Sequence, residues 1–287
     1  GIDGEWGLAM RLQKTQRFPY AITLGALNDS SSTYEVASEI GKQMHRLGIH
    51  MNFAPDVDIN SNPNNPIIGF RSFGENKHRV AMHALAYHRG LLSEGVLGCA
   101  KHFPGHGDVF TDSHHEMPEV DKPLTSIDSS ELFPYKVLIK DGIPAVMTGH
   151  LHLPQIDNRP NRPASLSNLL IDSLLKQKMG FTGLVITDAL NMKGVSKYYV
   201  AGELELEAFM AGNDILLFSE HVAEGFEKIK QAIISGKISE DKLNKSVLKI
   251  LYWKQRVGLN NYQDVIIDHL LSDLNPSSSS QIIQKVA

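Results

Sequence analysis

The chain has 287 residues, of which 42% are hydrophobic and 21% charged, which is enough apolar material for a large core. Its 28 Lys and Arg nearly balance its 32 Asp and Glu, and the signs are mixed along the chain, so no basic face for nucleic acid is predicted. No window approaches the roughly 18 uninterrupted apolar residues of a membrane span, and the single cysteine, Cys99, excludes an intrachain disulfide.

The chain opens with Gly1 and Ile2, with neither the charged nor the apolar segment of a signal peptide. This start predicts a trimmed chain, with whatever leading element the gene encodes absent from it. Composition does not separate the cytoplasm from the periplasm, so localisation stays undecided between these two.

Short apolar runs of strand length alternate with longer segments whose apolar residues recur every three or four positions, which is typical of repeated βα units. Several runs are rich in Val, Ile and Leu without alternation, as in parallel strands covered on both faces. We therefore predict an α/β fold. The predicted strands are residues 2–3, 51–59, 96–103, 145–153, 183–190 and 214–218.

Three helices are predicted, two between these strands and one after the last of them. Each has a terminating glycine, and two begin at a serine whose hydroxyl can cap the first turn. The last of them carries Leu243, Val247 and Leu251 at helical spacing. The predicted helices are residues 36–47 before Gly48, 167–179 from the cap Ser167 to Gly180, and 239–257 from the cap Ser239 to Gly258.

Polar residues gather where the predicted strands end. In barrels and open sheets of this class, reactive groups lie at the carboxyl ends of the strands, so these side chains are expected to meet at one rim. The residues concerned are Asp3, Asp56, Asp58, Lys101, His102, His150, His152 and Asp188.

The densest polar stretch runs from Lys101 to Pro118. Prolines and glycines at positions 104–107 stop both helix and strand, so a turn aims the flanking side chains. Further along, Asp112 stands two residues before His114, close enough for the carboxylate to orient the imidazole. A His held in this way is suited to proton transfer.

Simpler interpretations stay open for these residues. Each histidine of the stretch, taken alone, could be solvated or packed. Several of them with Asp112 could ligate zinc, although His102 and His106 are separated by Pro-Gly and cannot share one helical face. Asp188 could cap a following helix, and Lys101 could extend along apolar surface to water. We expect no metal and no cofactor.

The motifs of this sequence together resemble glycoside hydrolase family 3 and, within it, the bacterial β-N-acetylglucosaminidases. They follow the family's order across almost all of residues 1–259. The motifs are Ile2-Asp3-Gly4-Glu5-Trp6-Gly7 with Arg11, Asn52-Phe53-Ala54-Pro55, Gly69-Phe70-Arg71-Ser72-Phe73, residues 101–118, Met147-Thr148-Gly149-His150, residues 183–192, and Ala211-Gly212-Asn213-Asp214.

The resemblance implies that residues 1–259 form a TIM-like (β/α) barrel that begins at the family's third strand, so that the first two βα units are missing from it. An open barrel would expose edges and core. We therefore expect chain segments outside this sequence, or strands from another chain, to complete it. Residues 260–287, with a serine run at 277–280, are expected to be a linker or the start of a further domain.

The resemblance also implies roles for individual residues. Asp188 falls at the family's nucleophile, and His114, held by Asp112, falls at the acid and base of this branch. The substrate contacts that it implies, to sugar hydroxyls and the N-acetyl group, are Asp3, Arg71, Lys101 and His102. Glu5-Trp6 stands where many relatives carry other residues, so contacts near the non-reducing end are expected to differ.

The expected activity is that of a retaining exo-β-N-acetylglucosaminidase acting on cell-wall or chitin-derived fragments. Such an enzyme needs a carboxylate that forms a glycosyl-enzyme and a proton donor for the leaving oxygen. An imidazole donor, with a reference pKa of about 6.5, adds no negative charge to the site, so phosphate could approach. A family 3 phosphorylase, a β-glycosidase for another sugar and a non-catalytic sugar-binding module are the alternatives.

Overall fold

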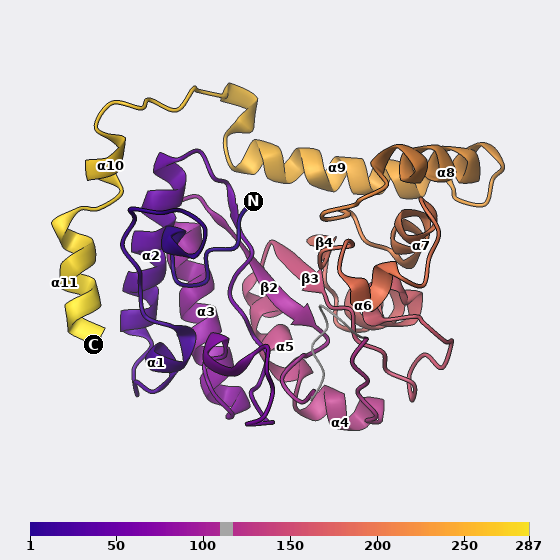
Figure 1. Ribbon diagram of the computed structural model, residues 1–287, viewed down its shortest axis with the longest axis horizontal. Helices are drawn as coiled ribbons and strands as arrows, with labels where there is room; N and C mark the ends of the chain where they lie inside the picture. The colour runs from indigo at the N-terminus through magenta and orange to yellow at the C-terminus, as the bar shows by residue number, and fades with distance from the viewer. Residues whose placement is uncertain (110–116, 287) are drawn as a thin grey trace.

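The structure, a computed structural model, describes residues 1–109 and 117–286 (Figure 1). Among these residues, a parallel sheet of four strands lies at the centre, in the order β1-β2-β3-β4. Parallel bridges from Ile2 to Asn52 and from Ile215 to Ile186 extend it at its two opposite edges. The strands are β1 (Met51–Asn52), β2 (Leu97–Phe103), β3 (Ala145–Thr148) and β4 (Leu184–Thr187).

All six predicted strand segments therefore lie in one parallel array, but the segment predicted over residues 51–59 leaves regular pairing early. β1 ends at Asn52, and Pro55 further along has no N–H to donate to a ladder. The segment still accepts hydrogen bonds, from the Cys99 N–H to the Ala54 carbonyl and from the Lys101 N–H to the Pro55 carbonyl. The chain thus follows β2 to the end of that strand.

Helices surround this sheet. The predicted helix before Gly48 is α2, and the one capped by Ser239 is α9, in which the Ser239 hydroxyl accepts the Lys242 N–H. The segment after Ser167 is a π-helix. The helices are α1 (Ala21–Gly25), α2 (Ser31–Arg46), α3 (Lys77–Ser93), α4 (Leu124–Ser129), α5 (Leu132–Asp141), α6 (Lys193–Ser196), α7 (Glu203–Ala211), α8 (Val222–Ile234), α9 (Glu240–Arg256), α10 (Leu270–Asp273) and α11 (Ser277–Val286), with 3₁₀ turns η1 (Leu8–Met10), η2 (Gly69–Arg71), η3 (Ala164–Leu166) and η5 (Leu259–Asn261) and the π-helix η4 (Leu169–Lys178).

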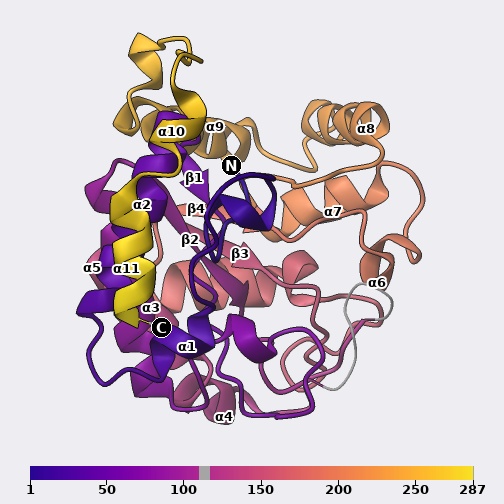
Figure 2. The same ribbon diagram turned by 60° about the vertical axis from the view of Figure 1, so that its left-hand side comes forward.

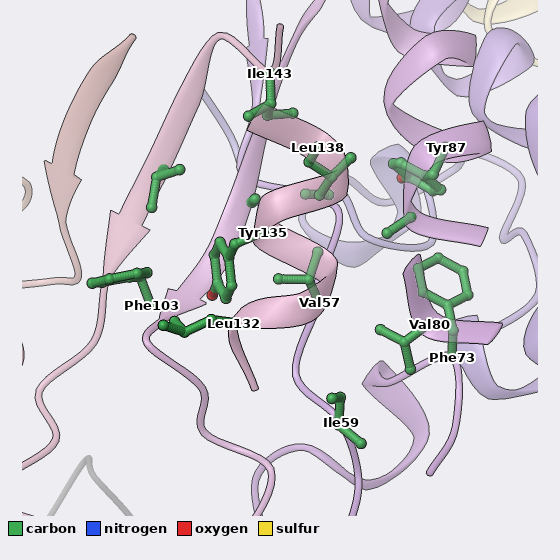
Figure 3. Close-up of a cluster of buried hydrophobic side chains, with 14 of the residues drawn as sticks. Val57, Ile59, Phe73, Val80, Tyr87, Phe103, Leu132, Tyr135, Leu138 and Ile143 are labelled. Carbon is green, nitrogen blue, oxygen red and sulfur yellow. The ribbon is translucent and has the colours of Figure 1, made fainter. Parts of the chain in front are cut away.

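The main core lies between the sheet and α2, α3 and α5 (Figures 1 and 2). Phe103 at the end of β2 stacks edge-on against Tyr135 of α5, with ring centroids 5.3 Å apart. Figure 3 shows Leu132 and Leu138 of α5 in the same cluster, with Tyr87 of α3 beside it. Burial of these side chains fixes the sheet on which the polar rim is built.

Helix α9 is rotated from the orientation that its apolar spacing predicts. Val247 and Leu251 are 42% and 54% exposed, whereas Ile250 and Trp253 pack against the second apolar cluster of the sheet. Polar contacts explain this rotation. Lys249 pairs with the carboxylate of Asp214, a group that also takes a hydrogen bond from a serine one turn earlier in the helix, and these contacts turn the 247/251 side outward.

Residues 277–280, the serine run, form the first turn of α11, which lies along α2 in both views (Figures 1 and 2). Ser279 donates to Glu39 and accepts from Gln43, and Val286 joins the main core. The division of the chain into 1–259 and 260–287 stays a prediction. None of the helices in the described ranges is long and apolar enough to cross a membrane.

Candidate functional site

A pocket of about 460 Å³ lies at the carboxyl ends of the strands and brings together five of the seven predicted site residues: Asp3, Arg71, Lys101, His102 and Asp188. They come from the Ile2 bridge, η2, β2 and the end of β4. The sheet therefore gathers side chains that are up to 185 positions apart onto one rim, as the strand-end argument predicts. A larger cavity, about 800 Å³, lies beside residues 257–266 and holds none of these residues.

The other two predicted residues, Asp112 and His114, lie outside the described residues, in 110–116. The segment that leads to them is tightly packed up to Val109. A Cβ added to Gly107 would lie 1.7 Å from the Ile59 carbonyl oxygen, so only glycine fits there. The proposed acid and base therefore stay predictions of the sequence.

The floor of the pocket is an ionic network. Lys101 Nζ lies 3.0 Å from Asp3 Oδ1 and 2.7 Å from Glu5 Oε1. Glu5 Oε1 also lies 2.7 Å from Arg71 Nη2, and Arg11 Nη2 lies 2.7 Å from Asp3 Oδ2 at the rim. Lys101 is buried, so it does not extend to water as a surface lysine would. Cations and carboxylates thus alternate beneath the pocket.

The charge states of this network follow from its geometry. Burial alone would raise the pKa of Glu5, but Lys101 and Arg71 override it and hold that pKa far below its usual range. At Asp3 burial also acts to raise the pKa of the carboxyl, but Lys101 and Arg11 outweigh it and the pKa is lowered. Burial works to lower the pKa of Lys101, while the two carboxylates raise it above its ordinary value. Both partners of each pair are therefore ionised at neutral pH.

A second buried group lies beside this network. Asp58 Oδ2 lies 2.7 Å from His102 Nδ1, and Asp56 Oδ2 lies 3.9 Å from the same nitrogen. Burial and the neighbouring Asp58 raise the pKa of Asp56 well above its usual range, whereas the imidazoles of His102 and His106 outweigh burial and lower the pKa of Asp58. One carboxyl of the pair is thus ionised and the other neutral.

Asp188 follows β4 directly, and its backbone N–H donates to the Thr148 carbonyl at 2.9 Å. Its Oδ1 accepts the Ala189 N–H at 2.8 Å. Burial raises the pKa of Asp188, but the imidazoles of His102 and His150 and this N–H together lower it below its ordinary value. Helix α6 begins four residues after Ala189, with Met192 as its cap, so Asp188 does not cap it.

His150 holds the backbone next to Asp188 through a hydrogen bond to Ala189. Its Nε2 lies 3.0 Å from the Ala189 carbonyl oxygen, which can only accept, so this nitrogen carries the proton. Its Nδ1 lies 2.7 Å from Ser165 Oγ, which then donates to it. Burial lowers the pKa of His150, against the opposing effects of Asp188 and of the Ala189 carbonyl, and the two hydrogen bonds of the ring fix the backbone beside Asp188.

A zinc site remains an alternative for this pocket. Within the described ranges, Asp56, Asp58 and His102 place possible ligand atoms within 4.8 Å of one another. The oxygens of Asp58 already accept hydrogen bonds from the His102 side chain and from two backbone N–H groups, and Arg71 lies 3.7 Å from Asp56. These contacts occupy both oxygens of Asp58 and Nδ1 of His102, whereas Asp56 Oδ2 is buried with no hydrogen-bond partner among the described residues.

Three contributors were missed as site residues in the sequence: Glu5, Arg11 and Asp58. Glu5 and Arg11 stand in the motif that contains Asp3, and Asp58 stands near the end of the predicted strand 51–59, among the residues expected at the rim. The sequence therefore indicated that these residues lie near the site. It did not indicate what they do there, because each acts by pairing with a partner, as Glu5 does with Arg71.

Known proteins of one family match this chain. Residues 1–252 match the family described as glycosyl hydrolase family 3 N terminal domain. Beta-hexosaminidase A of Pseudoalteromonas piscicida is 34% identical over 96% of this chain and 50% of its own length. Beta-hexosaminidase LpqI of Mycobacterium tuberculosis is 33% identical over 88% of this chain and 67% of its own.

Solved structures agree. A family 3 β-N-acetylglucosaminidase from a Paenibacillus species is 37% identical and superposes with a TM-score of 0.92 over 99% of this chain and 55% of that one. A beta-glucoside phosphorylase, BglX, is 25% identical with a TM-score of 0.89 over 96% of this chain and 51% of that one. The chain thus spans about half the length of several proteins that it matches. These matches confirm the predicted TIM-like α/β fold, here as a partial barrel, and the chain belongs to glycosyl hydrolase family 3.

Proposed function

We propose that this chain is the catalytic domain of a retaining exo-β-N-acetylglucosaminidase that removes terminal β-linked N-acetylglucosamine from cell-wall or chitin-derived fragments. One observation carries the proposal. An ionised carboxylate, Asp188, stands at a strand end in a pocket whose other walls present Lys101, Arg71, His102 and Asp3. The names of the relatives, beta-hexosaminidase and β-N-acetylglucosaminidase, support the choice of sugar.

In the first step, Asp188 attacks the anomeric carbon as the bond to the leaving oxygen breaks, and a glycosyl-aspartate forms. The lowered pKa of Asp188 keeps it a carboxylate at neutral pH, and the Ala189 N–H fixes one of its oxygens. The other oxygen is then the one that bonds to the sugar. Water cleaves the intermediate in the second step, so the anomeric configuration is retained.

His114, steadied by Asp112, is proposed to protonate the leaving oxygen and then to deprotonate the attacking water. An imidazole with a reference pKa of about 6.5 exchanges protons near neutrality without the burial that a carboxylic acid needs for this task. Asp3, Arg71, Lys101 and His102 are proposed to bind the hydroxyls and the N-acetyl group. Lys101 and Arg71 supply donors, and Asp3, whose side chain is 27% exposed and lines the pocket, supplies an acceptor.

Replacement of His114 by Ala is expected to slow substrates with poor leaving groups far more than nitrophenyl glycosides. A nitrophenolate leaves without protonation, whereas a sugar alkoxide needs the proton, and such assistance contributes about 10²–10⁴-fold. The measurement is kcat/KM on both substrate types for the wild type and His114→Ala. His269→Ala is the control, because His269 precedes α10 and does not line the pocket. Equal losses on both substrates would remove His114 from the role of acid.

Phosphorolysis is the second candidate, because a phosphorylase of 25% identity has the same fold. Products from a β-linked N-acetylglucosamine disaccharide, followed by NMR with and without phosphate, separate the possibilities. The proposal predicts β-N-acetylglucosamine as the first product in both conditions. A glycosyl phosphate would indicate a phosphorylase. Binding of the disaccharide without turnover, with Asp188 and His114 intact, would indicate a sugar-binding module and contradict the proposal.

A further inference from the structure

We propose that Asp58 is a positioning residue that locks His102 in the tautomer with the proton on Nδ1, so that Nε2 faces the pocket as a hydrogen-bond acceptor for one sugar hydroxyl. The tautomer follows from the contacts of Asp58 alone. The part that concerns the sugar rests on the function proposed above. Nothing in the sequence distinguishes this role, because it depends on which atom of His102 Asp58 contacts.

Both oxygens of the Asp58 carboxylate are held by hydrogen bonds from His102 and His106. Its side chain is buried, and its Oδ1 accepts the His106 backbone N–H at 2.6 Å. Both oxygens also lie near the His102 backbone N–H, at 3.3 and 3.2 Å, and Oδ2 lies 2.7 Å from His102 Nδ1. An ionised carboxylate can only accept, so Nδ1 must carry the proton in this contact. The backbone bonds hold the carboxylate in place while it orients the ring.

The contact on the Nε2 side of the imidazole supports the same tautomer. His102 Nε2 lies 3.4 Å from Arg71 Nη2, and a guanidinium has donors but no acceptor. A protonated Nε2 would place N–H against N–H at this contact. Arg71 cannot easily turn away, because Glu5 binds its Nε at 3.0 Å and its Nη2 at 2.7 Å. Both contacts therefore favour the ring with its proton on Nδ1 and, on Nε2, an electron pair that can accept a hydrogen bond.

Asp56 does not disturb this arrangement. Its Oδ1 accepts the Asp58 backbone N–H at 3.0 Å, and its Oδ2 lies 3.9 Å from His102 Nδ1, too far to compete with Asp58. Burial and the charge of Asp58 raise the pKa of Asp56 well above its usual range, so it adds no second negative charge beside the ring. A single carboxylate thus faces the Nδ1 proton.

The consequence is selectivity for a group that both accepts and donates. Lys101 and Arg71 offer donors to the pocket, and His102 Nε2 then offers an acceptor next to Arg71. A hydroxyl satisfies both, since its oxygen accepts from the guanidinium and its proton goes to Nε2. Fluorine or a methyl ether at the same ring position cannot donate, so it would place an acceptor against the electron pair of Nε2.

The variant that tests the tautomer is Asp58→Asn. Its amide oxygen is needed by the His106 and His102 backbone N–H groups, so its NH₂ would face Nδ1 and force that nitrogen to accept. The same substitution beside a catalytic His imposes the wrong tautomer in serine proteases. Nitrogen-15 NMR of the whole chain labelled at histidine reads the protonated nitrogen directly. The expected result is Nδ1–H in the wild type and Nε2–H in Asp58→Asn.

The matched control is Asp157→Asn. Asp157, like Asp58, is a buried aspartate. Its carboxylate lies 2.6 Å from Ser167 Oγ and pairs with Arg159, and this group lies outside the pocket. This variant should keep the wild-type signal of His102. An Nε2–H signal in the wild type would overturn the proposal even if Asp58→Asn did not fold. A folded Asp58→Asn that keeps Nδ1–H would overturn it as well.

The sugar part is tested with nitrophenyl N-acetylglucosaminides in which fluorine replaces one ring hydroxyl at a time. In the wild type, fluorine at one position is expected to raise KM by about tenfold or more, and in Asp58→Asn this penalty should shrink to below about threefold. An unchanged penalty in Asp58→Asn would contradict the acceptor role. Failure of the wild type to cleave any of these sugars would instead contradict the proposed function and leave the tautomer result standing.

Discussion

Asp188→Ala is expected to lower kcat by about 10⁴-fold or more on nitrophenyl N-acetylglucosaminide, because removal of a nucleophile leaves only substrate binding and the remaining catalytic groups. The change keeps the hydrogen bond from the Asp188 backbone N–H to the Thr148 carbonyl and loses only the one that the side chain accepts from the Ala189 N–H. The fold should therefore survive. Steady-state kinetics give the rate, and the midpoint of urea unfolding shows whether the variant is folded.

Azide sharpens this test. In Asp188→Ala, the small anion can enter the vacated space and attack the same face of the sugar, so it should restore turnover and give an α-glycosyl azide. Asp172→Ala is the control, since Asp172 pairs with Lys176 on η4 and lies outside the pocket. Loss of rate in Asp188→Ala within tenfold of that in Asp172→Ala would contradict the assignment of Asp188.

Glu5→Gln is expected to lower the free energy of unfolding by about 3 kcal/mol, because two buried cations, Lys101 and Arg71, lose the carboxylate that they share. Urea unfolding at pH 7 measures the loss. The pKa of Glu5 is lowered in the folded state, so its contribution is present above the pKa of the unfolded chain, about 4.3, and is lost as the pH falls below it. The gap between wild type and variant should therefore narrow in acid.

Glu35→Gln is the matched control, because Glu35 pairs with Lys285 at the surface, where such pairs contribute about 1 kcal/mol or less. KM of Glu5→Gln should also rise, since Lys101 and Arg71 both line the pocket. A loss of stability no greater than that of Glu35→Gln would show that the network under the pocket does not depend on Glu5.

The placement of the pocket could be predicted from the sequence, because it depends on strand order. Parallel strands bring their carboxyl ends to one edge, so residues near the ends of predicted strands, such as Lys101 and Asp188, were expected to meet. Even where regular pairing stops early, as after β1, the backbone still follows its neighbour. The hydrophobic runs thus predict where the site lies, but they do not predict which chemical groups act in it.

The pairing of side chains could not be predicted in the same way. Glu5 acts by joining Arg71 and Lys101, and which of the many carboxylates reaches them is decided by packing in three dimensions. The rotation of α9 is a similar case. Its apolar spacing favoured the side with Val247 and Leu251, but the bond between Lys249 and Asp214 turned that side to solvent.

The central claim, that Asp188 forms a covalent bond to the sugar, is tested most directly by trapping that bond. A 5-fluoro-N-acetylglucosaminyl fluoride slows both steps but carries a good leaving group, so the glycosyl-enzyme should accumulate on the intact chain. Peptic digestion and mass spectrometry then locate the label. The account predicts a glycosylated peptide with the modification on Asp188. A label on another carboxylate such as Asp3, or turnover of the reagent with every peptide unmodified, would contradict it.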